Sequence, residues 1–214
     1  MWLVTAGTFW GLAWAASPEG AEAQEPQVNV EPIGHELAAR MRGVTWHEGC
    51  PVPLEDLRRV QVPYVDFEGQ SQTGTLVVAA VSAEAVGKAF LEAYQAGFQI
   101  EKMSPVVQYQ GDDALSMAAN NTSAFNCRPV TGGGGWSAHA LGLAIDVNPV
   151  QNPYVRGTRV LPEAGRAFLD RSVVRAGMLT RDGVLTQAFK RQGWTWGGAW
   201  NSLKDYQHFS ANGR

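Results

Sequence analysis

The pattern of hydrophobic and polar positions predicts a β-hairpin in the first half of the chain. Hydrophobic and polar residues roughly alternate over Val60–Glu68, which is typical of a strand, and Pro63 favours an edge position. The apolar run Thr75–Val81 predicts a second, buried strand, because nearly all of its side chains are hydrophobic. The polar turn Gly69–Gly74 would join the two strands.

Further short elements are predicted on both sides of this hairpin. A helix is expected after the second strand, with Ser82 as its cap, one apolar face and an end at Gly97. Helices are also predicted over Pro53–Arg59, Pro162–Asp170 and Asp182–Gln192, and strands over Ser104–Gln110 and Leu141–Val147. Gly111–Gly135 has little periodicity and predicts a long loop, which in a compact domain is often functional. Because strands and helices do not alternate regularly, we expect an α+β fold with a small, mainly antiparallel sheet flanked by helices.

The first 23 residues have the pattern of an export signal. Met1–Ala16 is apolar and uncharged, but it is shorter than the roughly 20 residues that span a bilayer. Ala21-Glu-Ala23 matches the small-x-small pattern that precedes signal cleavage. We therefore expect residues 1–23 to be a signal peptide, or a membrane leader because no Lys or Arg precedes the apolar run; a buried N-terminal helix is the alternative. Residues 24–44 are interpreted as a linker or N-terminal extension, and residues 45–214 as one globular domain.

Composition and charge exclude several classes of protein. The chain has 214 residues, of which 45% are hydrophobic and 17% charged, and this argues against intrinsic disorder. A formal net charge of −3 provides no strong positive field, so we expect no nucleic-acid partner. Beyond the leader no segment is long and apolar enough to cross a membrane, so we expect no stable membrane insertion of the mature chain.

The two cysteines, Cys50 and Cys127, predict a disulfide if the protein is exported. A metal site and a nucleophilic role for Cys127 are the alternatives. They are disfavoured because the chain has no third cysteine and no C-x-x-C motif.

The segment Ser137–Asp146, with the sequence S-A-H-A-L-G-L-A-I-D, contains the first candidate chemistry. On the predicted strand Leu141–Val147, one face is apolar, and the other has Gly142 and Ala144 followed by Asp146. We expect these small residues to leave space beside the carboxylate, although small residues also occur where sheets pack closely.

His139 and Asp146 supply a nitrogen and an oxygen donor, which zinc commonly binds. A catalytic zinc needs a third protein ligand, and the chain has only four histidines. His208 is the candidate, because it follows Asp205 in the sequence D-Y-Q-H and Asp205 is then placed to act as a general base. The remaining two histidines are interpreted as surface or packing residues: His35 and His47.

The pattern S-x-H-x-x-G-x-A-x-D followed by D-x-x-H resembles the zinc peptidases that cut peptidoglycan stem peptides. This family includes the zinc D-alanyl-D-alanine carboxypeptidases, the D,D-dipeptidases of vancomycin resistance and the phage-type L-alanyl-D-glutamate endopeptidases. The resemblance covers roughly Cys50–Phe209, and it includes Asn121–Arg128, Asp146–Pro149 and Trp194–Gly198.

The resemblance implies one Zn²⁺ ion held by His139, Asp146 and His208, with Asp205 as the catalytic base. It also implies that residues 45–214 are the catalytic domain, with a zinc D,D-peptidase-like fold and the zinc site on one face of the sheet. Arg128 resembles the arginine that polarises the scissile carbonyl in such enzymes; the alternative is a surface ion pair.

Two further residues are expected to line the substrate site. Ser137 would contribute a hydroxyl near the metal. Trp196 would form a wall of the groove, although a core or supporting role explains it equally well. The Gly132–Gly135 run is not followed by Lys-Ser/Thr, so it is interpreted as a flexible rim rather than a phosphate-binding loop.

The resemblance therefore predicts a zinc peptidase that hydrolyses peptidoglycan stem peptides, as a D-alanyl-D-alanine carboxypeptidase. An L-alanyl-D-glutamate endopeptidase and a non-catalytic cell-wall-binding module on the same fold are the alternatives. We expect a monomer that is secreted or associated with the cell wall.

Overall fold

The computed structural model describes residue 1, residues 26–130 and residues 133–213. The predicted leader over residues 1–23 lies, Met1 apart, outside the described residues, as does Gly132 of the predicted rim. The fold is α+β, with small, mostly antiparallel sheets and few helices, as the sequence predicts. None of the helices in the described part of the chain is long and apolar enough to cross a membrane.

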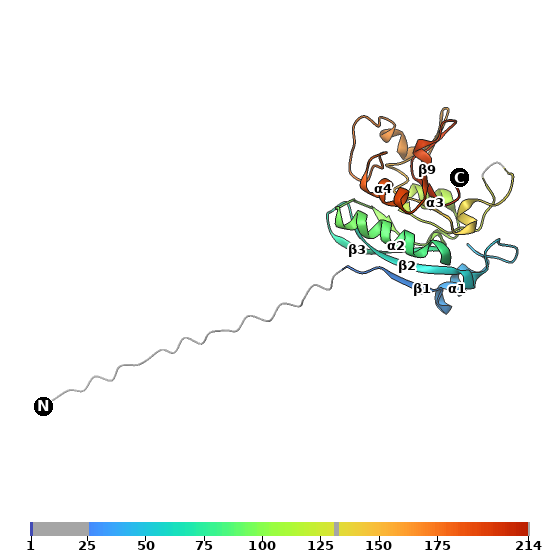
Figure 1. The fold of residues 1–214 in the computed structure, drawn as a ribbon, viewed down its shortest axis with the longest axis horizontal. Coiled ribbons are helices and arrows are strands. Elements are labelled where there is room, and N and C mark those ends of the chain that lie inside the picture. The colour runs from blue at the N-terminus through green and yellow to red at the C-terminus, as the bar shows by residue number, and fades with distance from the viewer. Residues whose placement is uncertain (2–25, 131–132, 214) are drawn as a thin grey trace.

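The main sheet is antiparallel and has the order β1-β2-β3. It comprises β1 (Asn29–Pro32), β2 (Leu57–Val65) and β3 (Ser71–Ala79), and β2 and β3 form the predicted hairpin. The helix α2 (Ala80–Gln95) follows β3 directly and covers one face of this sheet (Figure 1). Because side chains alternate along a strand, Val60 and Val62 both face α2 and pack into the larger core.

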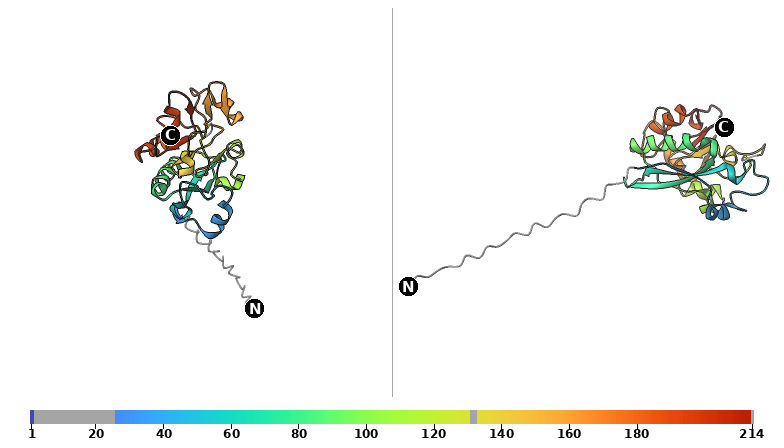
Figure 2. Two further views of the ribbon diagram at one scale, coloured as in Figure 1. Left: turned by 90° about the vertical axis from the view of Figure 1, so that its right-hand side faces the viewer. Right: turned by 60° about the horizontal axis from the view of Figure 1, so that its bottom comes forward.

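The C-terminal part of the chain lies on the other side of α2 from the main sheet (Figures 1 and 2). The helix α4 (Val184–Arg191) packs there, and the ring of its Phe189 meets Phe90 of α2 edge-on at 5.7 Å between centroids. A second, smaller core fills the opposite face of the main sheet, around Leu57 and Val77. Around Leu57 and Val77 the main sheet is therefore covered on both faces.

The C-terminal part contains two further three-stranded sheets, with the orders β6-β11-β9 and β10-β7-β8. Their strands are β6 (Ala144–Asp146), β7 (Tyr154–Arg156), β8 (Arg159–Leu161), β9 (Thr195–Trp196), β10 (Lys204–Asp205) and β11 (His208–Ser210). Short 3₁₀ helices connect the elements: η1 (Leu54–Asp56), η2 (Val106–Tyr109), η3 (Ala138–Leu141), η4 (Glu163–Phe168) and η5 (Gly197–Ala199).

The prediction that the strand around Pro63 lies at an edge is wrong, because β2 is the central strand. Pro63 is tolerated for a local reason. β1 pairs only with Arg58–Gln61, so at Pro63 the strand β2 has a partner on one side alone, namely β3.

Part of the segment interpreted as a linker or extension is regular structure. Residues 29–32 form β1, and α1 (His35–Met41) follows it. Met41 is buried in the smaller core, so this segment packs against the main sheet rather than extending from it.

Several element boundaries also differ from the prediction. Ser104–Gln110 is not a strand: β4 (Lys102–Met103) precedes it, and η2 occupies its centre. The predicted helices Pro53–Arg59 and Pro162–Asp170 contain the 3₁₀ helices η1 and η4. The caps of α2 and α4 are Ala79 and Gly183 rather than Ser82 and Asp182.

The predicted long loop Gly111–Gly135 contains α3 (Asp113–Ala118) and β5 (Asn121–Thr122). The carboxylate of Asp112 starts α3, because it accepts a hydrogen bond from the backbone N–H of Leu115 at 3.0 Å. Asp112 is the signal in the sequence from which α3 could have been predicted. It was overlooked because the hydrophobic residues of this segment have no clear helical periodicity.

Cys50 and Cys127 form a disulfide, as the sequence predicts. The bond lies at the margin of the smaller core and joins the segment after α1 to the segment before Arg128. It therefore ties the N-terminal part of the fold to the region that leads into the Ser137–Asp146 motif.

The double variant Cys50→Ser/Cys127→Ser should unfold more readily than the wild-type protein. The cysteines are 77 residues apart, and in the chain-entropy model a closed loop of this length contributes about 4 kcal/mol to the free energy of unfolding. Urea unfolding measures the difference, and wild-type protein treated with a dithiol reductant is the control, because it should shift by a similar amount. Equal stability of variant and wild type would contradict the prediction.

Candidate metal centre

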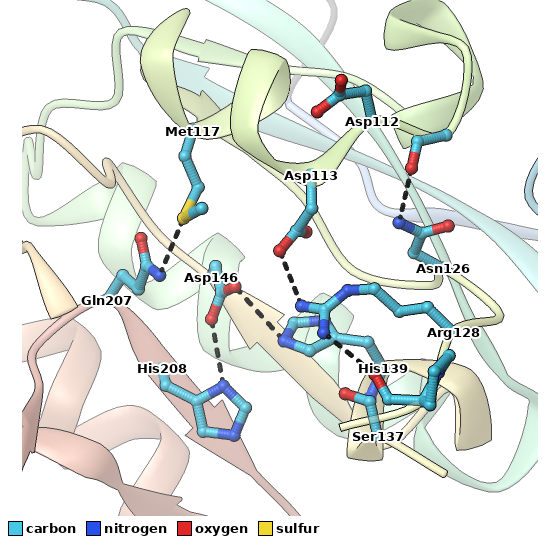
Figure 3. A network of polar contacts seen from close by, with 12 residues as sticks. Asp112, Asp113, Met117, Asn126, Arg128, Ser137, His139, Asp146, Gln207 and His208 are labelled. Carbon is cyan, nitrogen blue, oxygen red and sulfur yellow. Dashed lines mark hydrogen bonds and ion pairs between the residues drawn. The ribbon is translucent and has the colours of Figure 1, made fainter. Parts of the chain in front are cut away.

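Three side chains of the sequence motif converge at the pairing of β6 with β11. The two strands are antiparallel, and Asp146 lies directly opposite His208. Nδ1 of His208 lies 3.0 Å from Oδ1 of Asp146, and Nε2 of His139 lies 3.2 Å from Oδ2 of the same carboxylate (Figure 3). One donor atom from each residue lies within 4.8 Å of the other two, and all three residues are buried. The cluster therefore has the donors and the closeness that a metal ion requires.

The ring of His139 is oriented by two contacts. Ser137 caps η3, and its hydroxyl accepts a hydrogen bond from the backbone N–H of His139 at 3.2 Å. Nδ1 of the imidazole lies 2.7 Å from the carbonyl oxygen of Ala124, to which a neutral ring can donate its proton. In that tautomer Nε2 carries the lone pair, which faces the carboxylate of Asp146, as in a histidine ready to bind a metal.

The segment that contains Ala124 holds the motif against the rest of the fold. Ser123 and Asp146 exchange two backbone hydrogen bonds, each of 2.9 Å. Two residues further along, the N–H of Phe125 donates to the carbonyl of Val77 in β3 at 2.9 Å. The segment thus connects the cluster to the main sheet.

The electrostatics of the cluster favour an ionised carboxylate. Burial alone would raise the pKa of Asp146, but charge interactions and hydrogen bonds with His139 and His208 outweigh it and hold this pKa below its usual range. Burial alone would lower the pKa of His139, yet the neighbouring carboxylate of Asp146 raises it. A proton on Nε2 of His139 would occupy the position that a metal ion takes, and metal binding displaces such a proton.

Asp205 lies in β10, three residues before His208. The residue is partly exposed, but its Oδ1 is buried and has no hydrogen-bond partner within the described ranges. Burial raises the pKa of Asp205 to about 7; the charges of Asp146 and Asp113 act in the same direction, and those of His208 and Arg128 oppose it. A carboxyl group with this pKa can exchange a proton near neutral pH.

The position of Asp205 depends on two glycines and a tryptophan. A Cβ on Gly197 would lie 2.5 Å from the carbonyl oxygen of Asp205, so only glycine allows this approach. Gly198 is in similarly close contact with the ring of Trp196. The indole N–H of Trp196 donates to the carbonyl of Tyr206 at 2.7 Å. The Trp-Gly-Gly segment therefore packs against the backbone of Asp205 and Tyr206 and holds it in place.

A different tryptophan contacts a candidate ligand. The ring of Trp200 lies 5.5 Å from the ring of His208, whereas Trp196 packs partly against the larger core. Trp200 precedes the D-Y-Q-H sequence by only a few residues, as Trp194 and Trp196 also do. The sequence alone does not show which of these three tryptophans contacts His208.

Arg128 forms an ion pair with Asp113 of α3, at 2.7 Å (Figure 3). The pair is partly buried, and the Nε atom of Arg128 is buried without a partner in the described structure. The guanidinium is close enough to affect the pKa values of His139 and Asp205. Arg128 therefore forms an ion pair, but a partly buried one beside the cluster rather than one at the surface. Asp113 was missed because α3 falls in the predicted loop.

Gly142 follows the second of the two interpretations given to the small residues of the motif, namely close packing. Gly142 has a φ of +65°, and a Cβ there would lie 2.4 Å from the backbone nitrogen of Ala79. That nitrogen donates to the carbonyl of Gly142 at 3.0 Å. The glycine permits close packing of the motif against the junction of β3 and α2, so it does not serve to leave space beside Asp146.

A second group of potential ligands brings together His47, Cys50 and Cys127. Its two sulfurs are bonded to each other, so neither is available as a thiolate. Within the described part of the chain, the His139, Asp146 and His208 cluster is therefore the candidate metal centre.

Comparison with known proteins supports a peptidase. Residues 131–211 match a family model described as D-alanyl-D-alanine carboxypeptidase, and the match includes all three residues of the cluster and Asp205. This confirms the family resemblance that the motifs predict. No curated protein and no solved structure matches the chain.

The variant Gly197→Ala should lose both stability and the correct position of Asp205. The added methyl group would overlap the backbone of Asp205, and such overpacking typically costs about 1–3 kcal/mol in the free energy of unfolding. Urea unfolding measures this cost.

Gly34→Ala is the matched control, because Gly34 has a φ of −67° and no described atom lies within 4 Å of a Cβ placed there. If both variants unfold at the same urea concentration, the close approach at Gly197 does not constrain the fold.

Proposed function

Because residues 131–211 match a peptidase family model, we propose that the protein is a zinc-dependent peptidase that hydrolyses peptidoglycan stem peptides. The reaction expected first is removal of a terminal D-alanine from D-alanyl-D-alanine, and cleavage between L-alanine and D-glutamate is the second candidate. The cluster of His139, Asp146 and His208, with the unpartnered Asp205 carboxyl nearby, supports this proposal.

The residues of the cluster fit a zinc ion. Two imidazoles and one carboxylate form a common donor set for catalytic zinc, and three protein ligands leave a position open for water or substrate. Nε2 of His139, the carboxylate of Asp146 and Nδ1 of His208 would hold the ion, because these atoms already face one another. When bound, zinc supplies Lewis acidity, which polarises a carbonyl group and lowers the pKa of water.

Asp205 would move the proton in this reaction. Its buried Oδ1 atom has no partner among the described residues, so it is free to accept a proton from the attacking water. The protonated carboxyl can then donate to the nitrogen of the leaving amine. Burial raises the pKa of this carboxyl above its usual range, and a raised pKa suits a group that both accepts and donates a proton.

Arg128 would stabilise the negative charge that develops on the carbonyl oxygen during attack. A fixed cation is effective only when it is already oriented before the reaction. Asp113 provides that orientation by holding one end of the guanidinium, while the Nε side has no partner in the described structure.

Ser137 and Trp196 are better explained as positioning residues than as substrate contacts. Ser137 accepts the N–H of His139, and Trp196 donates to the carbonyl of Tyr206. Ser137 thus supports the candidate ligand His139, and Trp196 supports Tyr206, the residue next to Asp205.

The disulfide and the predicted leader support action outside the cytoplasm, where disulfides persist and peptidoglycan is located. A non-catalytic cell-wall-binding module, which is the alternative, would not require a general base beside the metal. The presence of Asp205, supported by Gly197, favours the enzyme.

Zinc content and stem-peptide cleavage, measured together on three proteins, test the proposal. Wild-type protein should contain one zinc ion and release amine from a synthetic stem pentapeptide. Asp205→Asn should retain zinc but lose about 10²–10⁴-fold in kcat, because proton transfer is lost. His139→Ala should lose both zinc and activity.

The variant His35→Ala is the control, because His35 is exposed on α1 and should retain zinc and activity. Wild-type protein that binds zinc but releases no amine from any stem peptide would exclude the enzyme and favour the binding module. Full activity of Asp205→Asn would exclude Asp205 as the base.

Arg128 and Asp113 should act as one unit. Arg128→Ala should lower kcat by about 10²–10³-fold with little change in KM, because its charge is needed in the transition state. Asp113→Asn should lower kcat less, and the double variant should be no worse than Arg128→Ala alone, since the aspartate acts only through the arginine.

The exposed pair of Arg166 and Glu163 provides the matched control, and Arg166→Ala should leave kcat unchanged. Additive losses in the Arg128 and Asp113 variants would show that the two residues act independently.

A further inference from the structure

The proposed base and two of the candidate ligands lie in different sheets. Asp146 and His208 belong to the sheet β6-β11-β9, whereas Asp205 belongs to the sheet β10-β7-β8. Residues 147–153 lead from β6 to β7, and residues 206–207 lead from β10 to β11. The position of the base relative to the metal centre therefore depends on how these two connections are held.

Arg171 holds the connection between β6 and β7 by hydrogen bonds. One terminal nitrogen of its guanidinium donates to the carbonyl of Gln151 at 2.7 Å. The other donates to Oδ1 of Asn152 at 3.1 Å and to the carbonyl of Leu179 at 2.6 Å. The side chain of Asn152 donates in turn to the carbonyl of Val147 at 3.1 Å. Together the two side chains fix this connection from its first residue to Asn152.

The same guanidinium lies over the ring of Tyr206, in the connection between β10 and β11. Cζ of Arg171 is 4.4 Å from the ring centroid, which is within the range of a cation–π contact. The ring centroid of Trp196 is 6.1 Å from that of Tyr206. The backbone N–H of Tyr206 also donates to the carbonyl of Pro153 at 3.3 Å. Because Tyr206 follows Asp205 directly, a fixed Tyr206 restricts the movement of the carboxyl.

We propose that Arg171 is a positioning residue, which fixes the proposed base Asp205 relative to the candidate metal ligands. The proposal rests on the proposed function and adds to it a residue outside the metal centre. Arg171 is partly buried in the connection between η4 and α4. A planar guanidinium can donate to several oxygens and also lie over an aromatic ring, and a lysine ammonium does not reproduce this geometry.

The candidate ligands should not depend on Arg171 in the same way. Asp146 and His208 face each other within one sheet, and His139 is held by Ser137 and Ala124. Loss of the guanidinium should therefore displace the base and leave the three candidate ligands together.

Peptidase kinetics of zinc-loaded variants, measured with a synthetic stem pentapeptide, test the proposal. Arg171→Met should lower kcat by about 10- to 100-fold, because a displacement of about 1 Å at a reacting group can cost a factor of about 10². KM and zinc content should stay close to the wild-type values. Tyr206→Leu should lose a similar factor, and the double variant should be no worse than either single variant. Tyr206→Phe keeps the ring and should retain most of kcat.

Arg175→Met is the matched control. Arg175 lies between η4 and α4 as well, with Cζ 3.8 Å from the ring centroid of Phe168. Within the described part of the chain, no hydrogen bond or ring contact joins Arg175 to residues 147–153 or 206–207, so kcat should be unchanged. A merely structural Arg171 would lower the melting temperature of Arg171→Met without changing the kcat of the folded protein. That result would overturn the proposal, as would equal losses of kcat in the two variants.

Amide hydrogen exchange tests the positioning without reference to activity. The N–H of Tyr206 should exchange faster in Arg171→Met than in wild type, whereas the amides of β11 should keep their wild-type rates. An unchanged rate at Tyr206 would overturn the proposal. A wild-type protein that cleaves no stem peptide would refute the proposed function, and the exchange measurement would still decide whether Arg171 holds the connection.

Discussion

The candidate site depends on the register of two short strands. Because Asp146 of β6 lies opposite His208 of β11, a carboxylate and an imidazole from distant parts of the chain meet on one face. A shift of one residue would turn one of the two side chains to the other face of the sheet. Hydrogen bonds with Ser137 and Ala124 hold the third residue, His139, in position beside this pair. The geometry of the candidate metal centre therefore depends first on strand pairing and second on side-chain hydrogen bonds.

The supports of the site lie in segments with little regular structure. The residues from Ser123 to Phe125 connect Asp146 and His139 to β3, and the Trp-Gly-Gly segment holds Asp205. Such segments keep their shape through backbone hydrogen bonds and close packing rather than through helices. This explains why glycine occurs at Gly142 and Gly197, where two backbones approach each other.

The sequence predicted the centre of the site better than its surroundings. The hairpin, the disulfide and the α+β class follow from strong local patterns, and the convergence of the three candidate ligands follows from their motif. Asp113 could not be found in this way, since α3 has only six residues and one capping signal. The role of Gly142 could not be decided between open space and close packing, because a sequence does not show which backbone packs against it. The central position of β2 was missed because β1 lies in a segment that looked like a linker.

The distance along the chain between the donors has a consequence for when the site exists. His208 follows Asp146 by 62 residues, so an unfolded chain does not hold the donors together. The complete set forms only when β11 pairs with β6. A cation that bound this set would therefore stabilise the folded chain over the unfolded one.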